Sequence, residues 1–430
     1  MKKLIIFLLL INIFVFISAQ EINLLDIDIF QLDSIFDEPL VETPVNETGE
    51  SPVSVISNLR RRGIEFDASY EFQGALNPGW EVYPWELTGE EHFSWAIGIK
   101  MGSTIGINAQ ISETFRVRSI IQYEIPGFAF SLGDFFFDYN FIDRVFLRAG
   151  KYEQSWGISP NFSFTNLLSR VPDQDISPFS NGPSYIMKFD LPIGIGGLQV
   201  LAMTRADVTN DKIPNRDNIG FGAKYNLAYR WADFNFGLYY QNFMATRGFL
   251  SIKTTLWDID FYNEWLAVFN NHTDNSFNLS FNLGFSKAFL NNKLEINGEF
   301  FYNGEESTFY YRPETEFRKE ETHPFLQGIN LALNLLYRFD GKWNPRLFAA
   351  MRYASTDTPQ EGLVKEPSFS MIPGFRITPF PNLDVYIAMP IAIGKGYYFR
   401  TMENVKQEHR PLSLLLYVTF RGSVQASHYY

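Results

Sequence analysis

Apolar and small polar side chains alternate with a period of two through most of this chain, most clearly between Ser276 and Ser286. Successive side chains of a β-strand point to opposite faces, so this stretch predicts a strand with one apolar and one polar face. Such a strand suits lipid on one side and water on the other. The apolar face comprises Phe277, Leu279, Phe281, Leu283 and Phe285, and the polar face comprises Ser276, Asn278, Ser280, Asn282, Gly284 and Ser286.

The first 19 residues have the pattern of a secretory signal peptide. Lys2 and Lys3 form a short basic region, residues 4–17 are almost wholly apolar, and Ser18 and Ala19 precede the expected cleavage site near Gln20. The apolar stretch is short for a transmembrane helix, which needs about 20 residues. We therefore expect residues 1–19 to be removed on export, leaving a protein without a helical anchor.

The composition narrows the class of protein. The chain has 43 Phe, 22 Tyr and 8 Trp among 430 residues, although only 20% of its residues are charged. A transmembrane barrel accommodates this apolar content because each strand alternates it with polar residues. No cysteine is present, which excludes disulfides, thiolate metal sites and a lipid-modified N-terminal cysteine. Without the two leader lysines, 34 bases face 48 acids, a net charge of −14 that makes nucleic acid an unsuitable partner.

The strand pattern begins at Gly63 and continues to the end of the chain. At roughly 20 to 26 residues per strand and connection, the remaining 368 residues give about 14 to 18 strands, with 16 as the best single value. We predict an all-β protein: a transmembrane antiparallel up-and-down β-barrel over residues 63–430, in the bacterial outer membrane. Besides the runs that begin at Gly63, Phe93 and Ser276, the runs read as strands are 115–125, 144–151, 185–191, 221–230, 234–243, 294–302, 329–339, 347–353, 383–393 and 412–420.

Two kinds of connection separate these runs. Short turns such as 291–292, 340–341 and 381–382 are expected to face the periplasm. Long, polar connections rich in Pro, Gly and charge are expected outside the cell. The long connections are 77–91, 171–184, 312–324, 356–368 and 401–410.

An acidic segment, residues 20–62, lies between the leader and the predicted barrel. Nine acids and no bases fall between Glu21 and Glu50. Leu25, Ile29, Leu32 and Phe36 have the spacing of an amphipathic helix. Two interpretations remain open: a disordered periplasmic extension, or a short helix that plugs the barrel or docks onto a periplasmic partner.

The alternation also predicts which charged residues line the lumen. In the runs 115–125 and 144–151 the apolar face points outward. The arginines that alternate with these apolar residues therefore point into the barrel. Acids across the channel from the arginines would form an acidic wall, and the two walls would sort solutes by charge and dipole. The alternative is that these charges only hydrate the interior and pair with one another. The candidates are Arg116, Arg118, Arg144 and Arg148 on one wall and Glu65, Asp67, Glu71, Glu295 and Glu299 on the other.

One segment resembles a known group of proteins. Residues 147–157 read Leu-Arg-Ala-Gly-Lys-Tyr-Glu-Gln-Ser-Trp-Gly and are followed by Pro160, Asn161 and Asn166. This order is similar to the strand, Gly-Lys, Trp-Gly and Pro/Asn-loop segment of several porin-like outer-membrane barrel families. The resemblance implies a diffusion channel, with the segment around Trp156 folded inward near the constriction. The alternative is that Trp156 belongs to the interfacial girdle and that the glycines mark turns.

The last run alternates from Leu412 to Phe420 toward an aromatic residue, which resembles the final-strand signal recognised by barrel assembly machinery. Ten residues, 421–430, follow that aromatic and depart from the pattern. Barrel assembly machinery and outer-membrane lipid are therefore expected partners, and a homo-oligomer is left open.

The sequence gives no sign of an enzyme, a metal site or a cofactor. The five histidines show no metal-binding spacing and belong to no recognisable Ser/His/Asp arrangement. We predict an outer-membrane channel for passive diffusion of small hydrophilic solutes. The alternatives are a surface adhesin or structural barrel that binds through its long loops, a hydrophobic-ligand transporter gated by residues 20–62, and a secreted soluble sandwich or propeller. The histidines are His92, His272, His323, His409 and His428.

Overall fold

The computed structural model describes the barrel strands, most short turns and part of one long connection. The predicted signal peptide and the acidic segment 20–62 lie outside the described residues. The described residues are 63–80, 93–125, 129–141, 144–152, 154–162, 184–204, 219–241, 246–269, 277–304, 308–311, 318–321, 328–355, 368–389, 391–393 and 412–429.

Twenty strand segments form one closed antiparallel sheet, and β14 and β15 pair separately. Because β19 and β20 share one position in the ring, as do β21 and β22, the barrel has 18 strands. The first nine are β1 (Gly63–Trp80), β2 (Phe93–Ser112), β3 (Phe115–Ile125), β4 (Ala129–Phe141), β5 (Val145–Tyr152), β6 (Ser184–Ile193), β7 (Gly196–Thr204), β8 (Ile219–Tyr229) and β9 (Ala232–Gln241). The others are β10 (Thr246–Leu256), β11 (Ile259–Phe269), β12 (Phe277–Phe289), β13 (Leu294–Asn303), β14 (Thr308–Tyr311), β15 (Arg318–Glu321), β16 (Gly328–Arg338), β17 (Arg346–Ser355), β18 (Ser368–Phe380), β19 (Leu383–Ala388), β20 (Ile391–Ile393), β21 (Leu412–Ser413) and β22 (Leu415–Tyr429).

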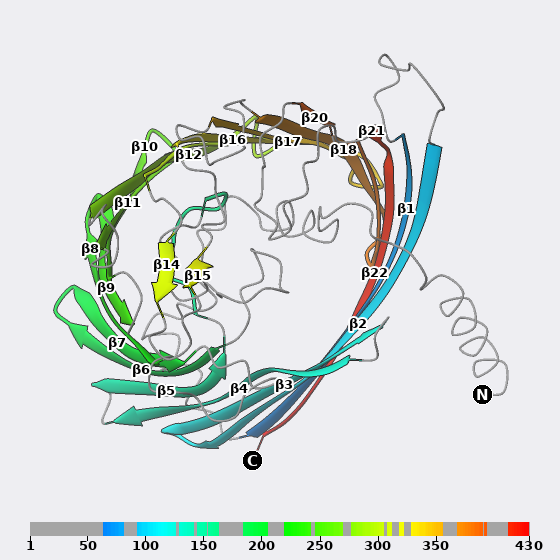
Figure 1. Ribbon diagram of the computed structural model, residues 1–430. Helices are drawn as coiled ribbons and strands as arrows, with labels where there is room; N and C mark the ends of the chain where they lie inside the picture. The colour runs from blue at the N-terminus through cyan, green and yellow to red at the C-terminus, as the bar shows by residue number, and fades with distance from the viewer. Residues whose placement is uncertain are drawn as a thin grey trace.

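Figure 1 shows the sheet closing on itself, with the C-terminal strand beside the N-terminal one. The ladder between β1 and β22 runs from the pair Gly63 and Tyr429 to the pair Leu76 and Leu416. Closure leaves no open sheet edge, which is the condition for a sheet inside a bilayer. The barrel prediction is confirmed. The number of strands falls at the top of the predicted range, and the single value of 16 was two too low.

The last strand is longer than the sequence pattern indicated. Residues 421–429 were read as an extension beyond the final strand, but they continue β22 and pair with β1 as far as Gly63. The strand therefore ends at Tyr429, an aromatic residue, and not at Phe420. The alternation fades in this stretch because outward positions carry the small residues Gly422 and Ala426 and not large apolar ones.

The two faces of the sheet differ in chemistry as the alternation predicts. Large apolar side chains such as Phe66, Ile105 and Leu283 are exposed on the outer face. Register partners share a face, so the pairing extends the inner face from Glu299 on β13 all the way round the barrel to Glu65 on β1. An apolar exterior around a polar interior suits a barrel surrounded by lipid.

The two ends of the barrel differ in the length of their connections. At one end, which we call the short-turn end, residues 113–114, 194–195, 230–231 and 257–258 join successive strands. Trp257 and Asp258 both have positive φ, 54° and 58°, as a tight two-residue hairpin turn requires. The predicted short turns at 291–292, 340–341 and 381–382 also lie at this end. The opposite end, the loop end, carries the long connections.

Five barrel strands were not recognised from the sequence, namely β4, β7, β10, β11 and β18, and neither were β14 and β15. In β4 the run Phe135-Phe136-Phe137 and a register shift opposite Ser119 to Ile121 obscure the alternation. In β18, Pro373 and Pro379 argue against a strand interior. Strands β7 and β11 carry apolar residues on both faces, because their inner faces are buried. No helix among the described residues is long and apolar enough to span a membrane.

Candidate functional site inside the barrel

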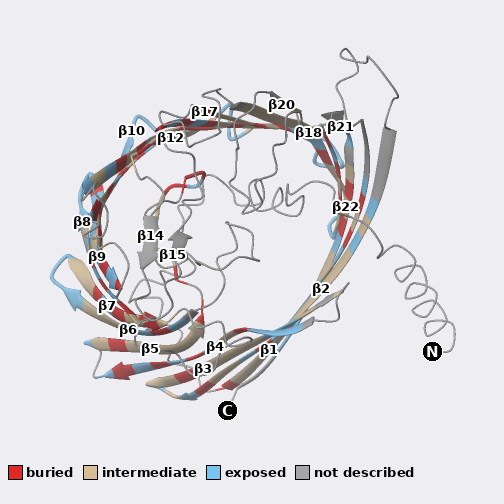
Figure 2. Cartoon of the chain, viewed as in Figure 1, coloured by how far each residue is buried: buried red, intermediate tan, exposed pale blue. Residues whose placement is uncertain are grey.

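A non-strand segment, residues 154–162, follows β5 and lies inside the barrel. We call it the inner strap. Figure 1 shows its coloured trace within the ring, and Figure 2 shows much of it as buried. Its contacts reach inward-facing side chains of β6, β7, β10, β11, β12, β13 and β16. The inner strap therefore covers about half of the inner wall.

Trp156 anchors the first part of the inner strap. Its Nε1 donates a hydrogen bond of 2.6 Å to Oε1 of Gln199 on β7. Its ring packs against Phe249 on β10, with 5.7 Å between the centroids. Gly222 on β8 leaves room for the indole, because a Cβ atom there would lie 2.5 Å from Cη2 of Trp156. Trp156 is only 2% exposed, so it is held tightly between the inner strap and the wall.

Polar contacts hold the second part of the strap against the wall. The backbone N–H of Ile158 donates to Oε1 of Glu264 on β11 at 2.8 Å. The side-chain amide of Asn334 on β16 donates to Oδ1 of Asn161, also at 2.8 Å. The hydroxyl of Ser159 accepts a hydrogen bond from Asn282 on β12. These partners are inward-facing residues of three different strands.

Glu299 on β13 is the centre of this network. Its carboxylate accepts hydrogen bonds of 2.7 to 3.2 Å from three residues of the strap. It also accepts hydrogen bonds from Tyr262 on β11 and Asn282 on β12. The side chain is buried, at 4% exposure, so these donors replace the water that would otherwise solvate the charge. The strap donors are the Ser159 hydroxyl, the Asn161 backbone and side-chain amides, and the Phe162 backbone N–H.

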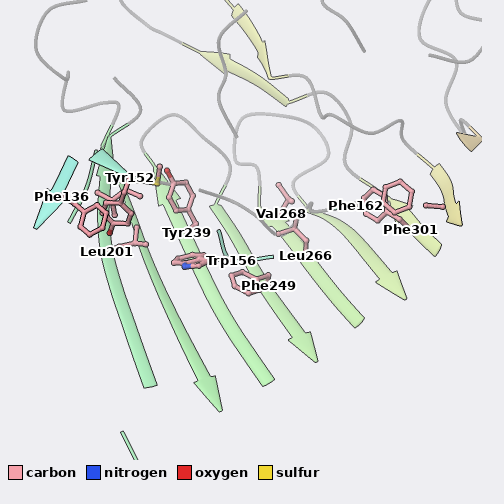
Figure 3. Close-up of a cluster of buried hydrophobic side chains, with 13 residues drawn as sticks. Phe136, Tyr152, Trp156, Phe162, Leu201, Tyr239, Phe249, Leu266, Val268 and Phe301 are labelled. Atoms are coloured by element: carbon pink, nitrogen blue, oxygen red, sulfur yellow. The ribbon is translucent and has the colours of Figure 1, made fainter. Parts of the chain in front are cut away.

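An apolar cluster lies between the strap and the wall at the loop end of the strands. Figure 3 shows its rings and aliphatic side chains near the ends of neighbouring strands. Phe162 stacks on Phe301 of β13, with 5.3 Å between the ring centroids. Leu266 and Val268 of β11 are fully buried in the same cluster. The apolar cluster and the Glu299 network together fix the strap to one side of the interior.

Two of the four predicted arginines converge. Arg116 on β3 and Arg148 on β5 both bind Asp138 on β4, which lies between them, with N–O distances of 2.5 and 2.7 Å. Arg118 lies one inward position further along β3 and is partly exposed. Arg144 lies in the turn before β5, where it is exposed, so the structure does not bring it to the other three.

The predicted acids do not form one wall opposite the arginines. Glu65, Asp67 and Glu71 lie on β1, only two strands from Arg116 and Arg118 on β3. Glu65 accepts a hydrogen bond from Asn108 of β2, the register partner of Arg118. The alternation correctly places these acids on the inner face, but it contains no information about how far apart two strands lie around the ring. Opposed charged walls of this composition are therefore absent from the described part of the barrel.

The two acids on β13 have separate roles. Glu299 holds the strap, as described above. Glu295 lies two inward positions nearer the short-turn end and pairs with Arg338 of β16. It is 3% exposed. Neither carboxylate faces open water.

Sequence reasoning missed Asp138, Glu264, Asn282 and Asn334. The first two lie on β4 and β11, strands that were not recognised. Asn282 was recognised only as part of a polar face, and Asn334 was not singled out. The inward position of these Asn, Asp and Glu residues could have been read from the alternation. Nothing in the sequence, however, specifies that residues 154–162 reach inward side chains of the wall.

Most of the histidines that were considered as catalytic or metal-binding residues lie outside the part of the chain that the structure describes. His92, His272, His323 and His409 lie outside the described residues, and His428 belongs to β22. Within the described ranges, no group of three or more His, Cys, Asp and Glu side chains is arranged to hold a metal ion.

Known structures of similar fold are outer-membrane porins. Pseudomonas aeruginosa OpdO aligns with 84% of this chain and 97% of its own, with a TM-score of 0.53 and 10% identity. Pseudomonas aeruginosa OpdQ covers 84% and 98%, with a TM-score of 0.54 and 10% identity. Acinetobacter baumannii OccAB3 covers 84% and 99%, with a TM-score of 0.52 and 9% identity.

No protein-family model matches the sequence, and no curated protein matches it. At about a tenth of identical residues, the structural likeness shows a shared barrel fold. It transfers no substrate and no individual site residue.

Proposed function

We propose that this protein is an outer-membrane channel through which small hydrophilic solutes diffuse passively, and that the inner strap narrows its lumen. The observation that carries the proposal is the closed 18-stranded barrel with a strap fastened inside it. Barrels of 16 to 18 strands are wide enough for an aqueous channel, whereas small barrels are filled by their own side chains.

The chemistry of the two faces supports this function. An apolar exterior suits outer-membrane lipid, and a polar interior suits a hydrated solute. The strap replaces part of the lumen with protein, and Glu299 fixes its position through hydrogen bonds and not through a covalent link. A fixed strap gives the channel a constant cross-section, as a passive sieve requires. The fold shared with OpdO, OpdQ and OccAB3 agrees with the proposal.

Conductance of the refolded protein in a planar lipid bilayer tests the proposal. Steady current that rises linearly with voltage, together with swelling of liposomes in small sugars, would support a diffusion channel. A correctly folded barrel that carries no current and admits no sugar would contradict it and would favour an adhesin or a transporter of hydrophobic ligands.

The role of residues 20–62 is a separate part of the proposal. A version that lacks these residues but retains the whole barrel should be compared with the full mature chain. Equal conductance of the two versions would make the segment an accessory, whereas conductance only in the shortened version would identify it as a plug. To identify the segment as a plug, adding it back as a separate peptide must also close the channel of the shortened version.

A further inference from the structure

We infer that the solute passage is eccentric: it runs along the inner face of β22, β1, β2, β3 and β4, and it admits neutral, hydroxyl-rich solutes with little preference between small cations and anions. This inference rests on the proposed channel function and adds where the solute passes and what chemistry it meets there.

Exposure divides the inner face into two parts. The first part, which we call the open wall, comprises β22, β1, β2, β3 and the end of β4 at Ser131, and its inward side chains such as Ser69, Gln122 and Ser423 are exposed. On the other part, which we call the strap wall and which comprises β6 to β13 and β16, inward polar side chains such as Ser251, Ser280 and Asn282 have 0% exposure. All of these residues face the interior, so away from the short-turn end the difference shows on which side water reaches the wall. Near the short-turn end, inward Asn226 and Asp233 of the strap wall are exposed as well.

A row of small uncharged polar side chains crosses the open wall. Ser69 pairs in register with Ser423 and Thr104, and the hydroxyls of Ser69 and Thr104 are 2.6 Å apart. Continuing the register, Thr104 pairs with Gln122, and the Ser131 hydroxyl donates to Gln122 at 3.4 Å. Hydroxyl and amide groups both donate and accept hydrogen bonds, so this row can exchange partners with a passing polyhydroxylated solute as well as with water.

Glycine widens the passage beside this row. Gly102 on β2 is the register partner of Glu71, and a Cβ atom at Gly102 would meet no atom within 4 Å. The inner face at Gly102 therefore borders open space. The inward glycine beyond Thr104, Gly106, is covered by the Asp67 carboxylate, so open space at an inward glycine is not a general feature of β2.

Among the side chains whose burial the structure describes, the partly exposed charges on β22 and β1 to β3 balance. Six such ionisable side chains face inward there, three acids and three bases. Arg421 and Glu71 form one pair across the seam between the last and first strands, at 3.3 Å. Balanced charge gives no net attraction for either sign of ion. The acids are Glu65, Asp67 and Glu71, and the bases are Lys100, Arg118 and Arg421.

Single cysteines test the position of the passage cleanly, because the chain contains no cysteine of its own. Ser69→Cys on the open wall and Ser280→Cys on the strap wall are matched variants, since both serines are inward-facing residues of barrel strands. Each full-length variant is treated with a methanethiosulfonate reagent that carries a sulfonate. Single-channel current and the mass of the protein are then measured.

We expect the Ser69→Cys variant to react with the reagent and its conductance to fall about two-fold. We expect the Ser280→Cys variant to stay unmodified and fully conducting. Modification of the Ser280→Cys variant without modification of the Ser69→Cys variant would overturn the eccentric passage. The mass measurement shows which cysteine is accessible even if the protein carries no current. Absence of current would contradict the proposed channel function but not the position of the open wall.

The solute preference has its own measurement. In a potassium chloride gradient the unmodified channel should show a reversal potential near zero, and liposome swelling should be faster in glycerol than in a sugar acid of similar size. A strong preference for chloride or for potassium would overturn the inference about ions. Faster entry of the sugar acid would overturn the inference about neutral solutes.

Discussion

The strap wall and the open wall come from the same sequence rule but have different physical states. In both, outward positions carry mostly apolar side chains and inward positions carry many polar ones. On the strap wall many inward polar groups are buried, and several of them bind residues 154–162, whereas on the open wall many of them meet water. Alternation therefore decides which way a side chain points, whereas the long connections decide whether an inward side chain contacts protein or water.

The cost of a substitution should follow this division. A buried polar group that loses its partner leaves an unsatisfied donor or acceptor, whereas an exposed one finds water. Changes on the strap wall should therefore lower the free energy of unfolding, and changes on the open wall should alter the current instead.

The largest effect is expected for Glu299→Leu. The substitution removes the acceptor for the hydroxyls of Ser159 and Tyr262 and for the backbone N–H groups of Asn161 and Phe162. The free energy of unfolding should fall by about 3 kcal/mol or more, because several buried donors lose their partner together. Urea unfolding in detergent, followed by tryptophan fluorescence, measures this loss, and single-channel current should become larger and noisier as the strap comes loose.

Asp67→Leu is the matched control on the open wall. Asp67 is partly exposed, and its carboxylate lies over Gly106 of β2. Unfolding should change little. Equal losses in the two variants would show that the strap network adds no more stability than an ordinary lumen charge.

A smaller loss is expected for Gly222→Ala. The added methyl group would lie 2.5 Å from Cη2 of Trp156, and Trp156 cannot move away without breaking its bond to Gln199. Overpacking of this kind costs about 1 to 3 kcal/mol. Gly98→Ala is the control, since its new Cβ would lie an ordinary 3.7 Å from Ala75. Similar unfolding curves for both variants would mean that the strap yields easily around Trp156.

The same division explains how much of the structure could be predicted from the sequence. The barrel, the inward direction of Glu65, Arg116 and Glu299, and the short turns all follow from local alternation and turn chemistry. β7 and β11 escaped recognition because Leu201 and Leu266, buried behind the strap, place apolar residues on their inner faces as well as on their outer faces. Inward burial therefore removes the signal by which a barrel strand is recognised.

The contacts of the site could not be predicted for a related reason. Ser159 and Glu299 are 140 positions apart, and their meeting depends on how a connection crosses the interior. The acids of β1 do not lie opposite the arginines, because the alternation carries no count of the strands between Glu65 and Arg116; that number is given by the order around the ring. The motif around Trp156 did direct attention to the segment that became the strap, although its partners were unknown.

Two glycines separate an effect on current from an effect on stability. Gly102 is an inward residue of the open wall, and Gly74 points outward from β1. A Cβ atom added at either glycine would have no atom within 4 Å. Gly102→Trp should leave the free energy of unfolding within about 0.5 kcal/mol of the parent value, as expected for a site without close neighbours. Its single-channel current should nevertheless fall, because the indole enters the passage. Gly74→Trp should leave the current unchanged, and a fall in both variants would argue against a passage along β2.

The smallest effect is expected at the short-turn end, for Lys293→Met. The hydrogen bond and charge of Asp340 raise the pKa of Lys293, so this ion pair favours the folded state at neutral pH and is lost only as the pH rises above the ordinary lysine range. Both side chains are well exposed to water, which screens the pair. Unfolding and current measured from pH 6 to pH 9 should therefore match the parent protein. A clear loss of either would mean that the turns at this end, and not only the two inner walls, help to hold the barrel in its conducting shape.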